Sequence, residues 1–234
     1  MKKLIALLVL IVCVSCHTTK YTHSGNVTSM LDLQKGKWLL NTIDSSKDIQ
    51  ENLEKIATEE FRELLGDRFS VVSTTRRILI PRNIDNNPSK SILKDVKNGT
   101  GADFFIMISA KVIRDEIGDL QIGSVDNPVQ NIGEITVDIY DLNLLERFYT
   151  HTAVGNLYVG KNSQDFAFAK SANNIVRKGL KRILKKIKKN QGKLSFELLE
   201  ILSVAFQEIN NSKGIESIEK IKKINSKKNE KMAQ

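Results

Sequence analysis

The stretch Ala102-Asp103-Phe104-Phe105-Ile106-Met107-Ile108-Ser109-Ala110-Lys111-Val112-Ile113 is the most hydrophobic segment outside the amino-terminal leader. It begins apolar on both faces, which is typical of a central strand that helices cover on each side of a sheet. Asn98-Gly99-Thr100-Gly101 precedes it and favours the end of a helix followed by a turn. The sequence therefore predicts a buried central strand over residues 102–113.

Periodic patterns on both sides of this strand predict the other elements. Apolar residues at three- and four-residue steps indicate a helix over Asp48–Leu65, and Ser89 is placed to cap a short helix. Strict alternation over 135–141 and 147–154, with Asn143 between them, indicates an antiparallel hairpin with one buried face. The remaining expectations are strands at 37–43 and 69–75, a long loop at 115–133, and a helix at 165–189.

These elements predict an α+β fold, an α/β sandwich in which two or three helices pack on a mixed sheet of about five strands. The predicted organisation is a signal peptide at 1–15, a flexible tether at 16–36, an α/β domain at 37–190 and a helical extension with a disordered tail at 191–234. Within the extension we expect helices over 194–209 and 215–224.

The leader predicts where the protein resides. Lys2-Lys3, the apolar run Leu4–Val14 and then Ser15-Cys16 form the pattern of a bacterial lipoprotein signal peptide, although Cys13 is unusual three residues before the cut. An uncleaved amphiphilic helix, or ordinary cleavage near Ser15, is the alternative; the apolar run is too short for a membrane-spanning helix. We therefore expect Cys16 to carry lipid, including palmitate, and the protein to be membrane-anchored in the cell envelope.

The residues after Cys16 predict how far the folded domain can lie from the membrane and which membrane holds the lipid. From His17 to about Lys35 the chain is rich in Thr, Ser, Gly and His, so it reads as a tether of about 60 Å when stretched. His17 is not the aspartate associated with inner-membrane retention, which favours the periplasmic side of the outer membrane.

Scarce cysteine and histidine exclude several kinds of active site. The cysteines are Cys13 and Cys16, so a cleaved and lipidated chain has no free thiol, disulfide or cysteine metal site. Of three histidines, His17 and His23 fall in the predicted tether and His151 in a strand, where a structural role is expected. The sequence predicts no cofactor, no metal and no enzymatic activity.

Positive charge gathers on one predicted helix face. The chain has a formal net charge of +9, which becomes +7 without Lys2 and Lys3. A solvated face that complements the helix dipole, or a surface that binds a polyanion or the membrane, would both produce this pattern. The export signal argues against nucleic acid as the polyanion. The eight cations are Arg177, Lys178, Lys181, Arg182, Lys185, Lys186, Lys188 and Lys189.

Two acidic residues leave a weaker catalytic hypothesis open. Asp138 and Asp141 flank Tyr140 on an alternating strand, and paired carboxylates can serve a hydrolase. Neither residue belongs to a larger acidic cluster, so surface charges on a strand are the expected interpretation.

The order of elements from Trp38 to Lys189 resembles the periplasmic α/β domain shared by the curli-secretion lipoprotein, the lipoprotein activators of penicillin-binding proteins and the amino-terminal domain of TolB. The resemblance rests on the helix Asp48–Leu65 leading into Phe69-Ser70-Val71-Val72, on Gly101-Ala102-Asp103-Phe104-Phe105-Ile106, and on the later hairpin and helix. The polar segment Asp115–Gly133, with Pro128, lies where a pore would need a long alternating hairpin. The resemblance thus implies binding or activation more than pore formation.

The predicted function is that of a non-enzymatic binding or adaptor module, anchored through Cys16, for an envelope protein or a cell-wall component. An oligomeric secretion or envelope-assembly component is the alternative, with a homo-oligomer as its expected state, and a hydrolase is the weaker one. No nucleic acid is expected among the partners.

Overall fold

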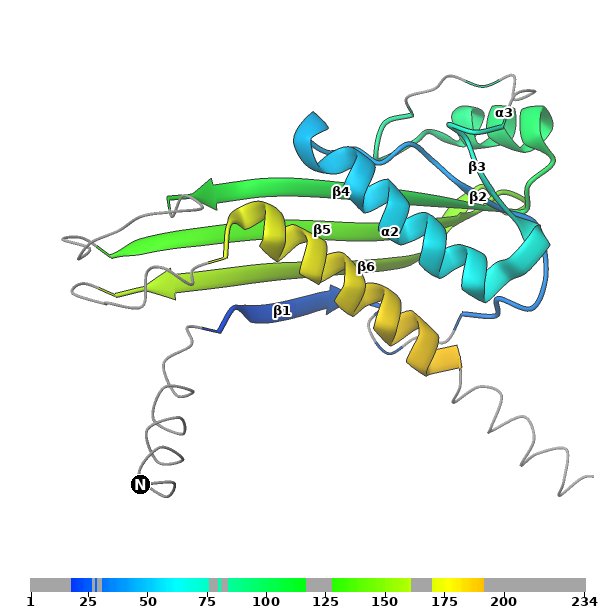
Figure 1. Ribbon diagram of the computed structural model, residues 1–234. Coiled ribbons are helices and arrows are strands. Elements are labelled where there is room, and N and C mark those ends of the chain that lie inside the picture. Colours follow the sequence, from blue (N-terminus) through cyan, green and yellow to red (C-terminus); the bar gives the residue numbers. More distant parts are fainter. Residues whose placement is uncertain are drawn as a thin grey trace, which may run out of the picture. The chain divides into compact units, whose positions relative to one another are not determined.

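The computed structural model describes residues 18–26, 28, 31–75, 80, 84–116, 128–160 and 170–191 (Figure 1). The chain divides into two compact units, Met1–Lys188 and Lys189–Gln234, and the architecture below is that of the first. The predicted signal peptide with Cys16 and the predicted helices at 194–209 and 215–224 lie outside the described residues.

A six-stranded mixed sheet forms the centre of the unit, in the order β1-β6-β5-β4-β2-β3. The four strands β1, β6, β5 and β4 pair antiparallel, whereas β2 pairs parallel with both β4 and β3. This confirms the predicted α+β class with a mixed sheet, with six strands in place of about five. The strands are β1 (Lys20–Gly25), β2 (Trp38–Leu40), β3 (Phe69–Val71), β4 (Phe104–Asp115), β5 (Val129–Asp141) and β6 (Glu146–Val159).

Helices cover the two faces of the sheet unequally. On one face, α2 (Lys47–Leu65) lies beside the helix over residues 172–191, drawn yellow to orange in Figure 1. Both run in the same direction, because Asp48 contacts Asn173 near their starts and Glu63 contacts Lys188 fifteen residues further along each helix. On the opposite face, α3 (Lys90–Thr100) packs at one end of the sheet, and the short 3-10 helix η1 (Gly66–Arg68) links α2 to β3.

The central strand β4 supplies side chains to both cores. Phe105 and Met107 join the cluster under α3, whereas Ile106 and Ile108 join the larger cluster under α2 and the helix at 172–191. Each of these four residues is at most 2% exposed, and burying such a side chain contributes about 1.5–3 kcal/mol. The two-faced burial predicted for this stretch is confirmed for residues 105–108, while residues 111–115 are exposed.

Helix ends follow the predicted capping residues. The Ser89 hydroxyl accepts a hydrogen bond from the Ile92 N–H at 3.4 Å, which satisfies one free donor at the start of α3. Gly101 ends α3 with φ of 66°, a left-handed conformation that glycine adopts without strain. The chain is thereby turned directly into β4.

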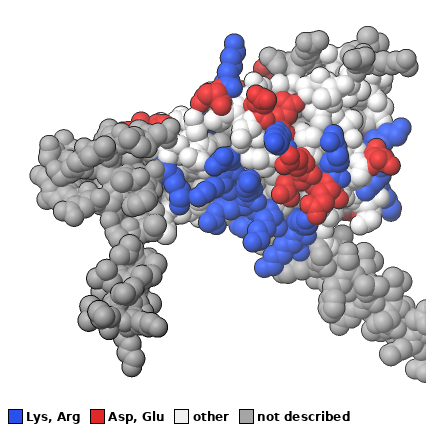
Figure 2. Space-filling model, viewed as in Figure 1, with Lys and Arg blue, Asp and Glu red and all other residues white. Residues whose placement is uncertain are grey.

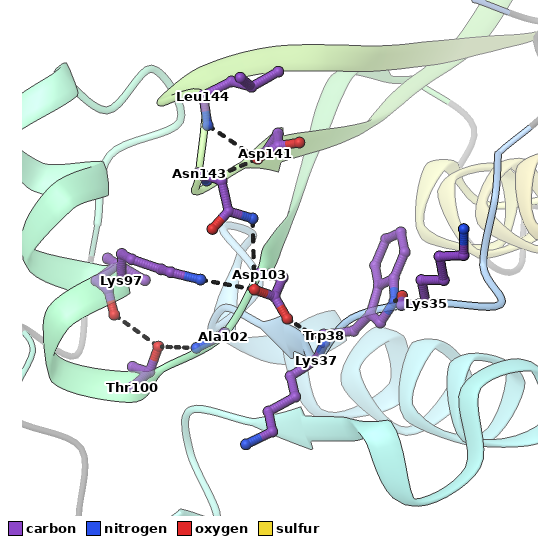
Figure 3. A network of polar contacts seen from close by, with 11 residues as sticks. Lys35, Lys37, Trp38, Lys97, Thr100, Ala102, Asp103, Asp141, Asn143 and Leu144 are labelled. Carbon is purple, nitrogen blue, oxygen red and sulfur yellow. Dashed lines mark hydrogen bonds and ion pairs between the residues drawn. The ribbon is translucent and has the colours of Figure 1, made fainter.

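Asp103 connects three segments at the start of β4 (Figure 3). Its carboxylate accepts hydrogen bonds from the Lys97 ammonium at 2.7 Å and from the Lys37 backbone N–H at 2.9 Å. Its backbone oxygen accepts from the Leu142 N–H at 2.8 Å. The hydrogen bond from Lys97, followed by the one from Lys37, lowers the pKa of Asp103. One residue thus joins α3, the segment before β2 and the β5–β6 turn.

The sequence-based assignment is wrong in two places. Residues 20–25 of the expected tether form β1, which pairs with Gly155 and its neighbours on β6. Residues 129–133 of the expected loop belong to β5, where they pair with β6 on one side. Both stretches are polar or glycine-containing, and their pairing partners lie far away in the sequence or across the hairpin, so local patterns do not reveal them.

Glycines let the helix at 172–191 approach the sheet closely. Gly133 on β5 is paired with Gly155 on β6, and a Cβ atom added at Gly133 would lie 2.6 Å from Val176 Cγ2 and 3.1 Å from the Ala172 oxygen. Within the part of the chain that the structure describes, no helix has the length and apolar character needed to cross a membrane.

We expect Gly133→Ala to lower the free energy of unfolding by about 1–3 kcal/mol, because its new methyl group overlaps the helix. Denaturant titration of the purified protein measures this change. Gly160→Ala is the matched control, since among the described residues the nearest atom to a Cβ there is Tyr158 Cε1, at 3.9 Å. Equal stability of the two variants would contradict close contact between the helix and the sheet at Gly133.

Candidate anionic-surface binding site

All eight predicted cations lie on the helix that covers β5 and β6. The helix turns Val176, Leu180 and Ile183 into the main core and leaves the opposite side to solvent. Figure 2 shows the resulting continuous patch of lysine and arginine across the middle of this view. Seven of the cations are exposed and Lys186 is half-buried, so the structure brings the predicted residues together on one helix.

The cations divide into two groups by their neighbours. On the side toward α2, the Lys188 ammonium pairs with the Glu63 carboxylate, and the Arg177 guanidinium donates to Asn174 Oδ1 at 2.6 Å. Five of the predicted cations in unit 1 remain, and they have no ion pair among the described residues. We call these the basic face: Lys178, Lys181, Arg182, Lys185 and Lys186.

Burial and neighbouring positive charges act on the lysines of the basic face. Partial burial lowers the pKa of Lys178, and the charges of Lys170, Arg177 and Arg182 lower it further. The pKa of Lys186 is likewise lowered, first by burial and then by Arg182. Positive charge is thus concentrated and uncompensated, which favours an anion at this surface.

Strand β1 lies against one flank of the basic face. The Arg182 guanidinium sits 4.4 Å from the centroid of the Tyr21 ring, in a cation–π contact. The Tyr21 hydroxyl donates to the Ile175 oxygen at 2.9 Å. Burial raises the pKa of Tyr21 to about 12, with the charge of Arg182 acting in the opposite direction. β1 is therefore held by the helix as well as by β6.

A buried polar chain continues from β1 into the sheet. His23 Nδ1 lies 3.1 Å from His151 Nε2, and the Tyr149 hydroxyl lies 3.1 Å from His151 Nδ1. His151 is fully buried. Burial, followed by the charges of His23 and Lys186, lowers the pKa of His151 to about 4, and burial is also the first cause of the lowered pKa of His23. The pair is thus held neutral near pH 7.

Sequence reasoning missed the partner of His151. The predicted tether includes His23, and only the β1–β6 register brings this residue beside His151. Alternation in Lys20-Tyr21-Thr22-His23 was the available signal, but it covers few residues and contains no aliphatic side chain. Lys170, which adds to the field at Lys178, was also not singled out.

Asp138 and Asp141 occupy separate structural contacts. Asp138 is 7% exposed and lies 3.5 Å from the Arg147 guanidinium. Asp141 Oδ1 accepts from the backbone N–H groups of Asn143 and Leu144 at 2.7 and 3.1 Å, within the β5–β6 turn. The described residues contain no group of three or more His, Cys, Asp or Glu side chains able to hold a metal ion.

A polar pocket of about 330 Å³ opens where β2 ends and α2 begins. Asn86 Nδ2 donates to the Asp44 carboxylate across it, and Gln50 Nε2 donates to the Ile43 oxygen at 2.9 Å. Its polar groups thus bond largely to one another. It carries less uncompensated charge than the basic face.

Comparison with known proteins reveals distant similarity in fold. No family model matches the chain, and no curated protein matches it. Among solved structures it is similar to the PelC dodecamer of Paraburkholderia phytofirmans (11% identity, 73% of this chain and 97% of that chain, TM-score 0.41). It is also similar to the C-terminal domain of LpoB from Escherichia coli (16% identity, 54% and 83%, TM-score 0.30). A putative neuraminyllactose-binding hemagglutinin homolog from Helicobacter pylori matches at 14% identity (72% and 100%, TM-score 0.33). Likeness at these values is confined to the fold and carries no information about what this chain binds.

We expect acid to destabilise the protein through the buried histidine pair. The unfolded chain binds a proton on His151 near pH 6.5, whereas the folded chain resists protonation until about pH 4. The free energy of unfolding should therefore be unaffected by this group above pH 6.5 and fall by up to about 3 kcal/mol as pH drops toward 4.

Denaturant titrations across this pH range, on the wild type and on His151→Gln, measure that effect. Glutamine retains hydrogen-bonding groups but does not titrate, so the variant should lose the part of the pH dependence that comes from His151. Parallel profiles for the two proteins would contradict it.

Proposed function

We propose that the protein is a lipid-anchored, non-enzymatic binding module of the bacterial cell envelope, attached through Cys16. Its partner is another envelope protein or a cell-wall component. The lipoprotein pattern around Cys16 supports the anchor. The separate structural contacts of Asp138 and Asp141 favour a binding role over a hydrolytic one.

The position of β1 is the observation that carries this proposal. Lys20, the first residue of β1, lies four positions after Cys16, and four chain steps span at most about 14 Å. β1 is then fixed by six paired positions on β6, from Lys20 with Asn156 to Gly25 with His151. A lipid on Cys16 would hold the domain close to the bilayer instead of at the end of a 60 Å tether.

This geometry restricts the partner. A domain with so short a connection can reach only components at or near the membrane surface, such as the membrane-proximal part of an envelope enzyme or assembly.

Lipidation is tested by labelling cells with palmitate. We expect the wild-type protein to incorporate the label and to partition into detergent, whereas Cys16→Ser should do neither, because the acceptor sulfur is absent. Cys13→Ser is the matched control and should be labelled like the wild type, since this position precedes the predicted cut. Labelling of Cys16→Ser would overturn the anchor.

The adaptor role is tested by crosslinking in intact cells, purification of the lipidated protein and mass spectrometry. We expect one envelope protein or cell-wall component to be recovered reproducibly. A ladder of the protein crosslinked only to itself would instead favour the oligomeric assembly component. Turnover of an envelope substrate that Asp138→Asn abolishes would favour the hydrolase.

A further inference from the structure

We propose that the basic face docks on the anionic phospholipid headgroups of the membrane that carries the anchor, and so fixes which side of the domain faces outward. The inference rests on the proposed attachment through Cys16 and adds a second, electrostatic contact. Its residues are Lys178, Lys181, Arg182, Lys185 and Lys186.

Intramolecular roles do not explain this charge. Interaction of cations with the helix dipole fades within about one turn of the helix end. Lys178, Lys181 and Arg182 lie more than two turns before residue 191, through which the helix continues. Lys188 shows what a structural cation looks like here, since it pairs with Glu63. The basic face has no such carboxylate among the described residues.

The anchor and the basic face lie on the same flank of the domain. Arg182 stacks on Tyr21, and the charge of Lys186 acts on His23, so both cations lie over β1. β1 begins within about 14 Å of Cys16 along the chain. A lipid inserted at Cys16 would therefore hold the basic face at the headgroups, where its effective concentration is high.

Acidic residues on α2 make the orientation specific. The helix beside the basic one, α2, carries six acidic residues against three basic ones, Lys47, Lys55 and Arg62, so its net charge is negative. Asp48, Glu51 and Glu59 are exposed there without an ion pair among the described residues. Figure 2 shows this acidic region next to the lysine and arginine patch. An anionic surface attracts the one helix and repels the other, so rotation about the tether is restricted with α2 directed away from the bilayer.

The position of the proposed anchor favours anionic lipid as the ligand of the basic face. A soluble polyanion could neutralise the same charges, but nothing holds it at this flank. Headgroups are present at high local density wherever the lipid is inserted. Within the described ranges, Tyr21 is the aromatic ring in cation–π contact with these residues, and Arg182 covers it, so it offers no surface on which a base could stack.

The test is lysine acetylation of the full lipidated protein in liposomes, read residue by residue by mass spectrometry. One set of vesicles contains phosphatidylcholine alone and the other also contains phosphatidylglycerol. We expect Lys181 and Lys185 to react several-fold more slowly in the anionic vesicles, and high salt to abolish the difference. Lys55 and Lys94, exposed on α2 and α3, should react equally in both.

Two charge-reversal variants with equal net charge test whether protection depends on where the cations lie or on net charge alone. Lys178→Glu/Lys181→Glu/Lys185→Glu should remove the protection of Lys186, whereas Lys55→Glu/Lys90→Glu/Lys94→Glu, with the same net charge, should retain it. All six residues are exposed, so both variants should fold, which denaturant titration verifies. Loss of protection in both variants would overturn docking through this face.

Vesicle flotation distinguishes this proposal from the anchor on which it rests. A protein that floats with both kinds of vesicle but whose Lys181 and Lys185 react equally in both is anchored and not docked, which would overturn the inference alone. A protein that does not float with neutral vesicles, but floats with anionic ones and has its lysines protected from acetylation there, would support docking and overturn the anchor. Protection by added soluble polyphosphate in neutral vesicles, with none from phosphatidylglycerol, would also overturn the membrane as occupant.

Discussion

Close contact between the helix at 172–191 and the sheet is the constraint on which the candidate site depends. Gly133 and Gly155 face the helix from paired positions on β5 and β6, and Gly179 faces the sheet from the helix. A Cβ at Gly179 would lie 2.8 Å from Ile135 Cγ2, so even alanine is too large without displacement. Because interiors are closely packed, three such positions fix the height and the direction of the helix.

That contact also explains why β1 joins the sheet. β1 is short and polar, and such an edge strand gains little from its own burial. Other contacts stabilise it, because the helix packs closely over β6. The Tyr21 hydroxyl donates a hydrogen bond to the Ile175 oxygen, and His23 lies beside His151. The packing that brings the basic helix onto the sheet therefore also places the start of the described chain beside that helix.

The sequence predicted the elements whose patterns are local. The central strand, α2, the cap at Ser89 and the β5–β6 hairpin follow from periodicity and capping chemistry. The sequence did not predict β1 and the start of β5, because their pairing partners are distant along the chain and their residues are polar. The eight cations were identified from their run alone, but their division between paired and unpaired groups depends on α2 and β1, which only the tertiary structure places.

The basic face makes the folded state less stable than a neutral face would. Burial, followed by the charge of Arg182 among others, lowers the pKa of Lys178 and of Lys186, whereas the residues that pack this helix on the sheet are apolar. A ligand that binds only the folded state stabilises it by an amount that grows with the concentration and the affinity of the ligand. An anionic surface would do so by neutralising charges that the fold leaves unpaired. If the proposed docking occurs, bound headgroups would therefore relieve the repulsion within the basic face.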